Sequence, residues 1–244
     1  MHPIIALWCH PRSRSTAMER VLIETEVFEV FHEPFSYYHY LEKEHRPFPN
    51  FHPEAHHPQT FDGIKDMILK AAETKPVFFK DMSYYVSDRF NSDESFFKRI
   101  KNTFLVRDPA AAFLSYLKLD DEFTVEEAGI EAQADHVDFL QNLNKSVPPI
   151  VSSDDLVEDP TGVFKAYCRG IGMSLDAGAL TWDPGTPEQW DYAKDWHTDA
   201  SESQGIQKPK DTKPVDLDAH PRLRALVEHH TPFYKKLMTR RLRP

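Results

Sequence analysis

The loop CHPRSRST, residues 9–16, combines residue types that bind anions. Its polar members are two arginines and three hydroxyl residues: Arg12, Arg14, Ser13, Ser15 and Thr16. The loop follows the apolar run PIIALW and precedes a helical pattern, so it should connect a strand to a helix. Helix N-termini favour phosphate or sulfate through their N–H groups and dipole, and arginine adds charge-assisted hydrogen bonds. The loop therefore predicts an anion site.

Two other interpretations of this loop are open. Ser13 or Ser15 could cap the helix while both arginines face solvent. The loop also differs from the G-x-x-x-x-G-K-[ST] loop of ATP-binding proteins, because it contains neither glycine nor lysine. A kinase or nucleotide hydrolase, with Asp81 as its metal-binding aspartate, is therefore the weaker hypothesis.

Short apolar segments alternate with helical patterns along the chain. Strands are expected at residues 4–10, 27–33, 76–82, 102–108 and 148–156. Helices are expected near 15–25, 60–73, 124–143 and 160–170, after Pro109, and near the C-terminus with a break near Pro232. This alternation indicates an α/β, three-layer, P-loop-like fold, with a central parallel sheet of about five strands flanked by helices. Ligands of such sheets bind beyond the carboxyl ends of the strands.

Composition limits the class of protein. The 244 residues are expected to form a single domain, 1–244, with irregular loops near 36–58 and 188–214. A net charge of −10 argues against a nucleic-acid partner but does not exclude a small anionic ligand. Two cysteines are too few for a disulfide framework, and neither a signal peptide nor a membrane span is expected from the sequence. A cytoplasmic location is expected.

A second segment, FLVRDPAAAFLSYLK, also carries an anion-binding pattern. Arg107 ends an expected strand, and Ser115 follows eight residues later in the helix that begins at Pro109. Taken alone, Arg107 could equally pair with a carboxylate. Together with PRSRST (11–16), however, the segment resembles the two signatures of sulfotransferases: a P-K-S-G-T-T loop, and R-D-P with a serine eight residues after the arginine. Arg12 stands at the position of the lysine and Arg14 at that of the glycine.

A third segment, VSSDDLVEDPTGVFKAYCRGIGM (151–173), is similar to a structural block of the same family. The resemblance implies 3′-phosphoadenosine 5′-phosphosulfate (PAPS) as donor, adenosine 3′,5′-bisphosphate as product, and a small-molecule hydroxyl or amine as acceptor. It also implies that residues 12–16 hold the 5′-phosphosulfate, and that Arg107 and Ser115 hold the 3′-phosphate. Lys208 or Lys210 could add a contact there or belong to a solvated loop.

The reaction needs cations for the leaving phosphate and a base for the acceptor. Arg12 and Lys80 are the candidate cations, by analogy with phosphoryl transfer. Many sulfotransferases have a catalytic histidine two residues after such a lysine, where this chain has Met82. The segment FHEPF (31–35) resembles the glutamate-containing segment of trehalose-type bacterial sulfotransferases, which makes Glu33 the candidate base and His32 the alternative. A base role requires burial to raise the pKa of Glu33.

Simpler roles for these side chains remain open. Glu33 could form an ion pair with Arg12 or Arg14, and Lys80 could pair with Asp81. Tyrosines that follow two strand ends could line an acceptor pocket or pack in the core: Tyr37, Tyr38, Tyr40, Tyr84 and Tyr85. The histidines of FHPEAHH (51–57) are weak grounds for a metal, and none is expected. A protein that binds adenosine 3′,5′-bisphosphate without catalysis is the remaining hypothesis.

Overall fold

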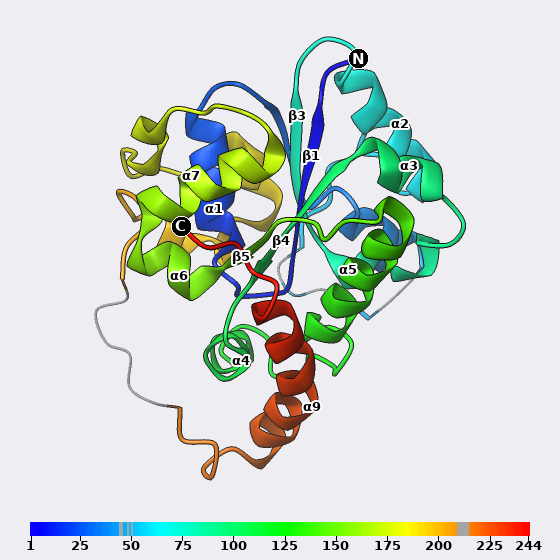
Figure 1. Cartoon of the computed structure of the whole chain (residues 1–244). Helices are drawn as coiled ribbons and strands as arrows, with labels where there is room; N and C mark the ends of the chain where they lie inside the picture. The colour runs from blue at the N-terminus through cyan, green and yellow to red at the C-terminus, as the bar shows by residue number, and fades with distance from the viewer. Residues whose placement is uncertain (44–45, 48, 50, 209–214) are drawn as a thin grey trace.

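A five-stranded parallel sheet forms the centre of the molecule (Figure 1). The computed structural model describes residues 1–43, 46, 47, 49, 51–208 and 215–244. The strands are β1 (Ile4–Cys9), β2 (Glu29–His32), β3 (Val77–Met82), β4 (Lys101–Val106) and β5 (Ile150–Ser152). Their order is β2-β3-β1-β4-β5, and every pairing is parallel. The predicted α/β fold with a central parallel sheet is confirmed.

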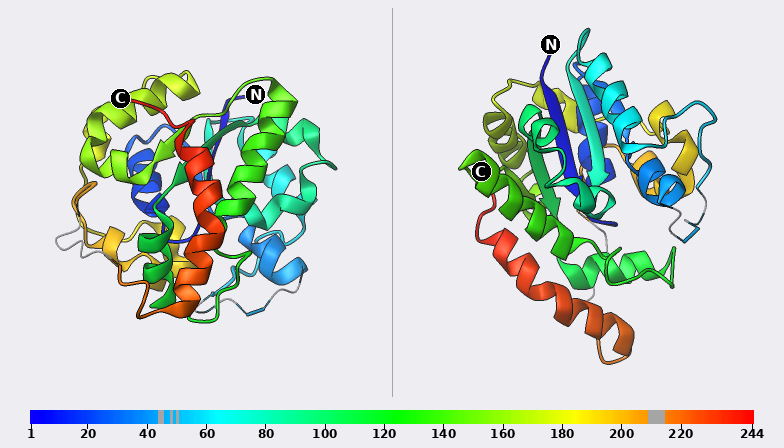
Figure 2. Two further views of the ribbon diagram at one scale, coloured as in Figure 1. Left: turned by 60° about the horizontal axis from the view of Figure 1, so that its bottom comes forward. Right: turned by 90° about the vertical axis from the view of Figure 1, so that its right-hand side faces the viewer.

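Helices cover both faces of this sheet. On one side lie α1 (Ser15–Glu24), α6 (Ser153–Glu158) and α7 (Pro160–Ile171), and on the other α2 (Phe61–Ala71), α3 (Glu94–Arg99) and α5 (Ile130–Asn144) (Figure 1). α9 (Pro221–Met238) packs against α5 and against α4 (Pro109–Leu117) (Figure 2). In the described part of the chain, no helix combines the length and the apolar character that crossing a membrane requires.

Burial on both faces explains the sequence of the central strands. All six residues of β1 and of β3 are buried, as expected for parallel strands covered by helices on both sides. Trp8 of β1 anchors one face, where its indole Nε1 donates to Asn102 Oδ1 at 2.8 Å. The amide of Gln133 donates to Trp8 O and Leu105 O, which ties α5 to β1 and β4.

Three predicted boundaries were wrong. The helix expected at 124–143 begins only at Ile130, because Gly129 takes a left-handed φ of 77° before it. The strand expected at 148–156 is short, because the Ser152 hydroxyl accepts from Asp155 N and starts α6. Pro232 lies inside the continuous helix α9 and does not break it.

Neither α3 nor several shorter helical segments were predicted from the sequence. They are a π-helix η1 (Tyr38–Glu42), three 3₁₀ segments, η2 (Ser83–Arg89), η3 (Ala177–Leu180) and η4 (Glu188–Trp196), and the single turn α8 (Thr198–Ser201). η1, η4 and α8 fall in the segments expected to be irregular.

We expect Asn102→Ala to lower the free energy of unfolding by about 3 kcal/mol, measured by urea denaturation. The substitution leaves Trp8 Nε1 without its acceptor, and Phe97 O and Ile100 O without the Asn102 amide, all in a buried site. Asn142→Ala, at an exposed position on α5, is the control and should change stability by less than about 0.5 kcal/mol. Equal effects of the two substitutions would contradict the anchoring role of Asn102.

Candidate active site

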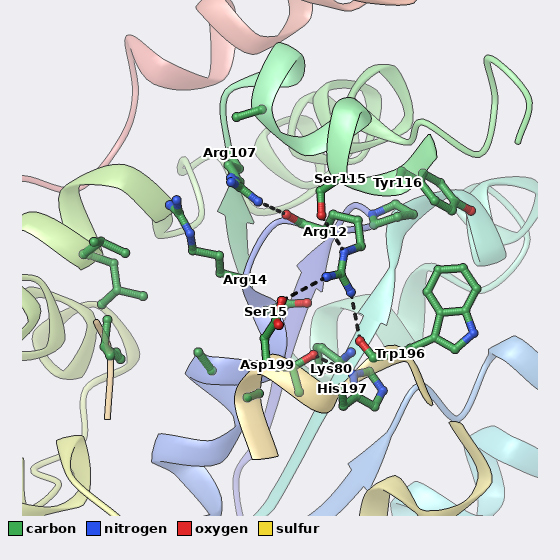
Figure 3. Close-up of a pocket in the computed structure, with 18 of the residues that line it drawn as sticks. Arg12, Arg14, Ser15, Lys80, Arg107, Ser115, Tyr116, Trp196, His197 and Asp199 are labelled. Carbon is green, nitrogen blue, oxygen red and sulfur yellow. Dashed lines mark hydrogen bonds and ion pairs between the residues drawn. The ribbon is translucent and has the colours of Figure 1, made fainter. Parts of the chain in front are cut away.

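A cavity of about 650 Å³ lies at the carboxyl ends of the strands (Figure 3). Polar side chains reach it from the loops after β1, β2 and β4, from the helices α1 and α4, from β3 and from the chain near α8, and they include Arg12, Arg14, Ser15, Thr16, Glu33, Lys80, Arg107, Ser115, His197 and Asp199. The structure thus brings together all the site residues expected from sequence except Ser13. Ser13 is fully buried, does not line the cavity, and its hydroxyl has no partner among the described residues.

The loop after β1 reaches the cavity through two left-handed residues. Arg12 has a φ of 59° and Arg14 a φ of 68°, and Arg14 is the residue before α1. Each such conformation costs a non-glycine residue about 1 kcal/mol. Arg14 therefore adopts a conformation that favours glycine, the residue of the family motif at this position.

The N-terminus of α1 is open toward the cavity. No described side chain caps this helix, which contradicts the interpretation of Ser13 or Ser15 as a simple cap. The first N–H groups of a helix have no partner within it, and here they belong to residues that line the cavity. The helix end can therefore donate to an anion.

Arg107 lies in a strongly positive setting. Its Nη1 donates to Arg12 O at 2.8 Å, and its buried Nε has no hydrogen-bond partner among the described residues. Burial and the nearby charges of Arg14 and Arg12 lower the pKa of Arg107 to about 10. Within the described residues it forms no ion pair with a carboxylate. Together with the orphaned Nε, this setting fits a site for an anionic group.

Arg12 and Arg14 contact different segments of the chain, and Figure 3 shows the contacts of Arg12. Arg12 donates to Ser115 Oγ at 3.1 Å and to Trp196 O at 2.8 Å, and its Nη2 lies 3.6 Å from Asp199 Oδ2. Arg14 donates to Asp154 Oδ1 at 2.9 Å. The loop at residues 9–16 is therefore connected to the end of η4, to α8 and to the start of α6.

Below these arginines lies a buried ion pair. Lys80 Nζ is 2.5 Å from Glu33 Oε1. Sheet register positions the pair, because Lys80 is opposite His32 and the Glu33 N–H donates to Lys80 O. Asp81 points to the opposite face of β3, where its carboxylate accepts from Phe35 N and Met82 N. Neither of the alternative pairings considered from sequence is present among the described contacts.

The ion pair sets the charge of Glu33. Burial alone would raise the pKa of this carboxyl, but the Lys80 ammonium and His32 outweigh burial and lower it. Burial alone would lower the pKa of Lys80, but the carboxylates of Glu33 and Glu19 raise it by more, so the net result is a raised pKa. The expected rise in the pKa of Glu33 is therefore wrong for the structure without ligand. Glu33 also has a left-handed φ of 41°, backbone strain of the kind that gathers at functional sites.

Sequence reasoning missed several groups that shape the cavity. His10 accepts from Arg107 N at 3.1 Å and donates to Pro11 O, so it joins the two anion loops. Burial and Arg107 lower the pKa of His10 to about 3 and keep it neutral. Trp196, His197 and Asp199 come from a segment whose only local signal is its aromatic and charged composition.

The remaining candidates have mixed outcomes. Tyr84 and Tyr85 line the cavity, while Tyr37, Tyr38 and Tyr40 do not. Lys208 lines it too, but its ammonium pairs with Glu158 at the surface, and Lys210 lies outside the described residues. Across the described positions, no three His, Cys, Asp or Glu side chains gather as a metal site.

Comparison with known proteins now decides the family. The family model described as "Sulfotransferase domain" matches residues 2–241. The chain belongs to the sulfotransferase domain family. No curated protein sequence matches it significantly.

Two solved structures share the sulfotransferase fold. The sulfotransferase domain of the Synechococcus PCC 7002 olefin synthase aligns with a TM-score of 0.51 and 17% identity, over 94% of this chain and 95% of that domain. A sulfotransferase from Alicyclobacillus acidocaldarius aligns with a TM-score of 0.56 and 11% identity, over 98% of this chain and 96% of that one. At such identities the likeness establishes the fold.

We expect Lys80→Met to destabilise this sulfotransferase by about 3–5 kcal/mol at pH 7, because it leaves the Glu33 carboxylate buried without a counter-charge. The double substitution Lys80→Met/Glu33→Gln should recover part of the loss. The deficit should shrink as the pH falls toward about 4, because Glu33 becomes protonated in the variant. In the wild type, the stability from the lowered pKa of Glu33 is also lost as the pH falls through that value.

Urea denaturation at several pH values measures both effects. Lys98→Met is the control, since it removes an exposed pair, Lys98 with Glu94, and should cost less than about 0.5 kcal/mol. A deficit for Lys80→Met that does not change with pH would count against the ion pair as its cause.

Proposed function

We infer that this sulfotransferase transfers the sulfuryl group of PAPS to a hydroxyl or amine of a small-molecule acceptor. The observation that carries the inference is the convergence of Arg12, Arg14 and Arg107 on one cavity that also contains the Lys80–Glu33 pair. In this proposal, PAPS supplies an activated sulfuryl group and two anionic ends. Arginine clusters and helix N-termini are suited to both ends.

Each end of the donor has its own set of residues. Arg12, Arg14, Ser15 and Thr16, with the first N–H groups of α1, hold the 5′-phosphosulfate. Arg107 and Ser115 hold the 3′-phosphate. The Ser13 side chain is not part of either set, because it does not line the cavity, and the Ser13 backbone N–H donates to His10 O at 3.3 Å.

The proposed transfer forms one bond and breaks one. The acceptor oxygen or nitrogen forms a bond to sulfur, while the bond from sulfur to the bridging oxygen breaks and its electron pair remains on the 5′-phosphate. Arg12 and Lys80 stabilise the charge that gathers there, and Glu33 takes the acceptor proton. The products are the sulfated acceptor and adenosine 3′,5′-bisphosphate.

The Lys80–Glu33 pair couples donor binding to base strength. An anion near Lys80 competes with Glu33 for its ammonium. Because Lys80 is the strongest influence lowering the pKa of Glu33, weaker pairing raises that pKa and makes the carboxylate a better base. Glu33 is favoured over His32 because Glu33 lines the cavity, whereas His32 is buried behind it.

The kinase hypothesis finds less support. Its metal-binding residue would be Asp81, which is fully buried, does not line the cavity, and accepts from two backbone N–H groups. Magnesium-dependent binding of ATP would favour that hypothesis over sulfuryl transfer.

We expect Arg107→Ala to weaken the binding of adenosine 3′,5′-bisphosphate about 50-fold, because a charge-assisted hydrogen bond to the 3′-phosphate is lost. Isothermal titration calorimetry measures the affinity. Adenosine 5′-phosphate, which lacks the 3′-phosphate, is the matched control ligand, and its affinity should change little. An equal loss for both ligands would contradict the 3′-phosphate assignment.

We expect Arg12→Ala to lower kcat by about 10²–10³, as loss of an oxyanion donor does. Glu33→Gln should lower kcat by about 10²–10⁴ while it still binds adenosine 3′,5′-bisphosphate, because it removes the base. The assay follows release of adenosine 3′,5′-bisphosphate from PAPS with a panel of phenols, alcohols, sugars and amines. Tight binding of this nucleotide without turnover on any acceptor would favour a non-catalytic binding protein.

A further inference from the structure

A buried chain of hydrogen bonds leads from the cavity into the protein. It begins at Thr16 of α1, whose Oγ1 lies 3.1 Å from His197 Nδ1. His197 Nε2 lies 2.9 Å from His32 Nε2, and His32 Nδ1 lies 2.7 Å from Glu19 Oε2. All three distances are those of hydrogen bonds. The mechanism proposed above uses only Thr16 of these four residues.

The inner end of this series of hydrogen-bonded side chains, at Glu19 and His32, is buried. The side chains of Glu19 and His32 are 0% and 1% exposed. Glu19 Oε2 also accepts from Trp190 Nε1 at 3.1 Å, whereas Oε1 has no partner among the described residues. A buried carboxylate that is only partly satisfied favours an added proton or a cation beside it.

The three hydrogen bonds of this side-chain series need three bridging protons. Without a ligand, Thr16, His197 and His32 supply one each, all directed toward Glu19, with both histidines neutral and Glu19 ionised. If the Thr16 hydroxyl turns its proton to an anion in the cavity, two protons remain for three contacts. All three hydrogen bonds therefore persist only if these side chains take up one proton.

We propose that His197, His32 and Glu19 are positioning residues for Thr16, which let its hydroxyl donate to a bound anion by taking up one proton. In the bound state His197 donates from Nδ1 to Thr16, and His32 donates from Nε2 to His197 and from Nδ1 to Glu19. The two hydrogen bonds of His197 thus reverse direction, whereas His32 donates to Glu19 in both states. The inference rests on the proposed anion site of the loop but not on the identity of the donor.

The surroundings place the added proton on His32. Among the side chains that the structure describes, the charged groups near the two rings are Arg12 from the loop, Glu33 after β2 and Lys80 of β3, besides Glu19. Burial, His32, Lys80 and Arg12 lower the pKa of His197 far below its ordinary value, so this ring stays neutral. His32 lies between two carboxylates, because its Nδ1 is 2.7 Å from Glu19 Oε2 and its Nε2 is 3.8 Å from Glu33 Oε1, and on this geometry the proposal assigns the added proton to His32.

Proton uptake on binding determines the direction in which the affinity for the anion changes with pH. When binding adds one proton, the affinity for the anion rises as the pH falls, by up to about tenfold per pH unit between the pKa values of the free and bound states. The same linkage means that bound anion stabilises the charged form of His32.

Nitrogen NMR of the protein labelled with ¹⁵N-histidine tests the proposal directly, because it distinguishes the two neutral tautomers and the charged ring. Inorganic sulfate, which carries no titrating proton near neutral pH, is one probe, and adenosine 3′,5′-bisphosphate is the other. We expect His197 to change from Nε2–H to Nδ1–H on saturation, and His32 to become doubly protonated. Spectra of the substituted proteins assign the signals.

Calorimetry in buffers of different ionisation enthalpy gives the number of protons taken up. We expect the wild type to take up about one proton more than Thr16→Val, and Thr16→Ser to restore the uptake. Glu19→Gln should reduce it. The matched control is His229→Gln, which removes an exposed His–Glu contact of 2.7 Å and should leave proton uptake unchanged.

The outcomes separate this proposal from the proposed function. If either probe binds and His197 keeps its Nε2–H tautomer, the proposed role of His197, His32 and Glu19 is overturned, even where the nucleotide binds tightly. If sulfate changes the tautomer of His197 and the protonation of His32 but adenosine 3′,5′-bisphosphate does not bind, the proposed proton uptake is supported and the assignment of the donor is overturned. If neither probe binds or alters the histidines, both are overturned.

Discussion

The parallel direction of all five strands is the constraint on which the site depends. Because the strands run the same way, the loops after β1, β2 and β4 and the last residues of β3 open onto one edge of the sheet. Residues almost a hundred positions apart, such as Arg12 and Arg107, therefore contact each other through the Arg107 guanidinium and Arg12 O. Reversing any one of these strands would remove its charged residue from the cavity.

The cavity concentrates positive charge in a protein whose net charge is −10. Three arginines repel one another there, and burial, together with the charges of Arg14 and Arg12, lowers the pKa of Arg107. Two exposed carboxylates partly offset it, Asp154 beside Arg14 and Asp199 beside Arg12. Exposed pairs of this kind contribute little stability, so an anion can replace these carboxylates at small cost.

The sequence predicted the parts of the fold and site that depend on local signals. Apolar runs, the proline after Asp108 and the hydroxyl and arginine content of the first loop each act over a few residues. Sheet register then brings the expected residues together, with Lys80 beside Glu33 as the clearest case. Ser13 does not line the cavity, and the sequence does not indicate which hydroxyl residue of a loop points inward.

Contacts between distant segments were not predictable in the same way. His197 and Asp199 follow a segment without hydrophobic periodicity, and their importance comes only from where the chain returns to the loop after β1. The charge state of Glu33 was also out of reach, since it depends on the balance between burial and one ammonium group. Such balances are tertiary properties, and residue types alone do not determine them.

Arginine at position 14, where the sulfotransferase signature that this loop resembles has glycine, takes a left-handed backbone conformation. Glycine has more conformations to lose than arginine when the chain folds, so arginine reduces the entropy lost on folding while it adds strain to the folded state. The hydrogen bond from Arg12 to Ser115 Oγ adds a further contact to the turn. An anion bound as proposed would therefore meet a loop whose backbone is already in place.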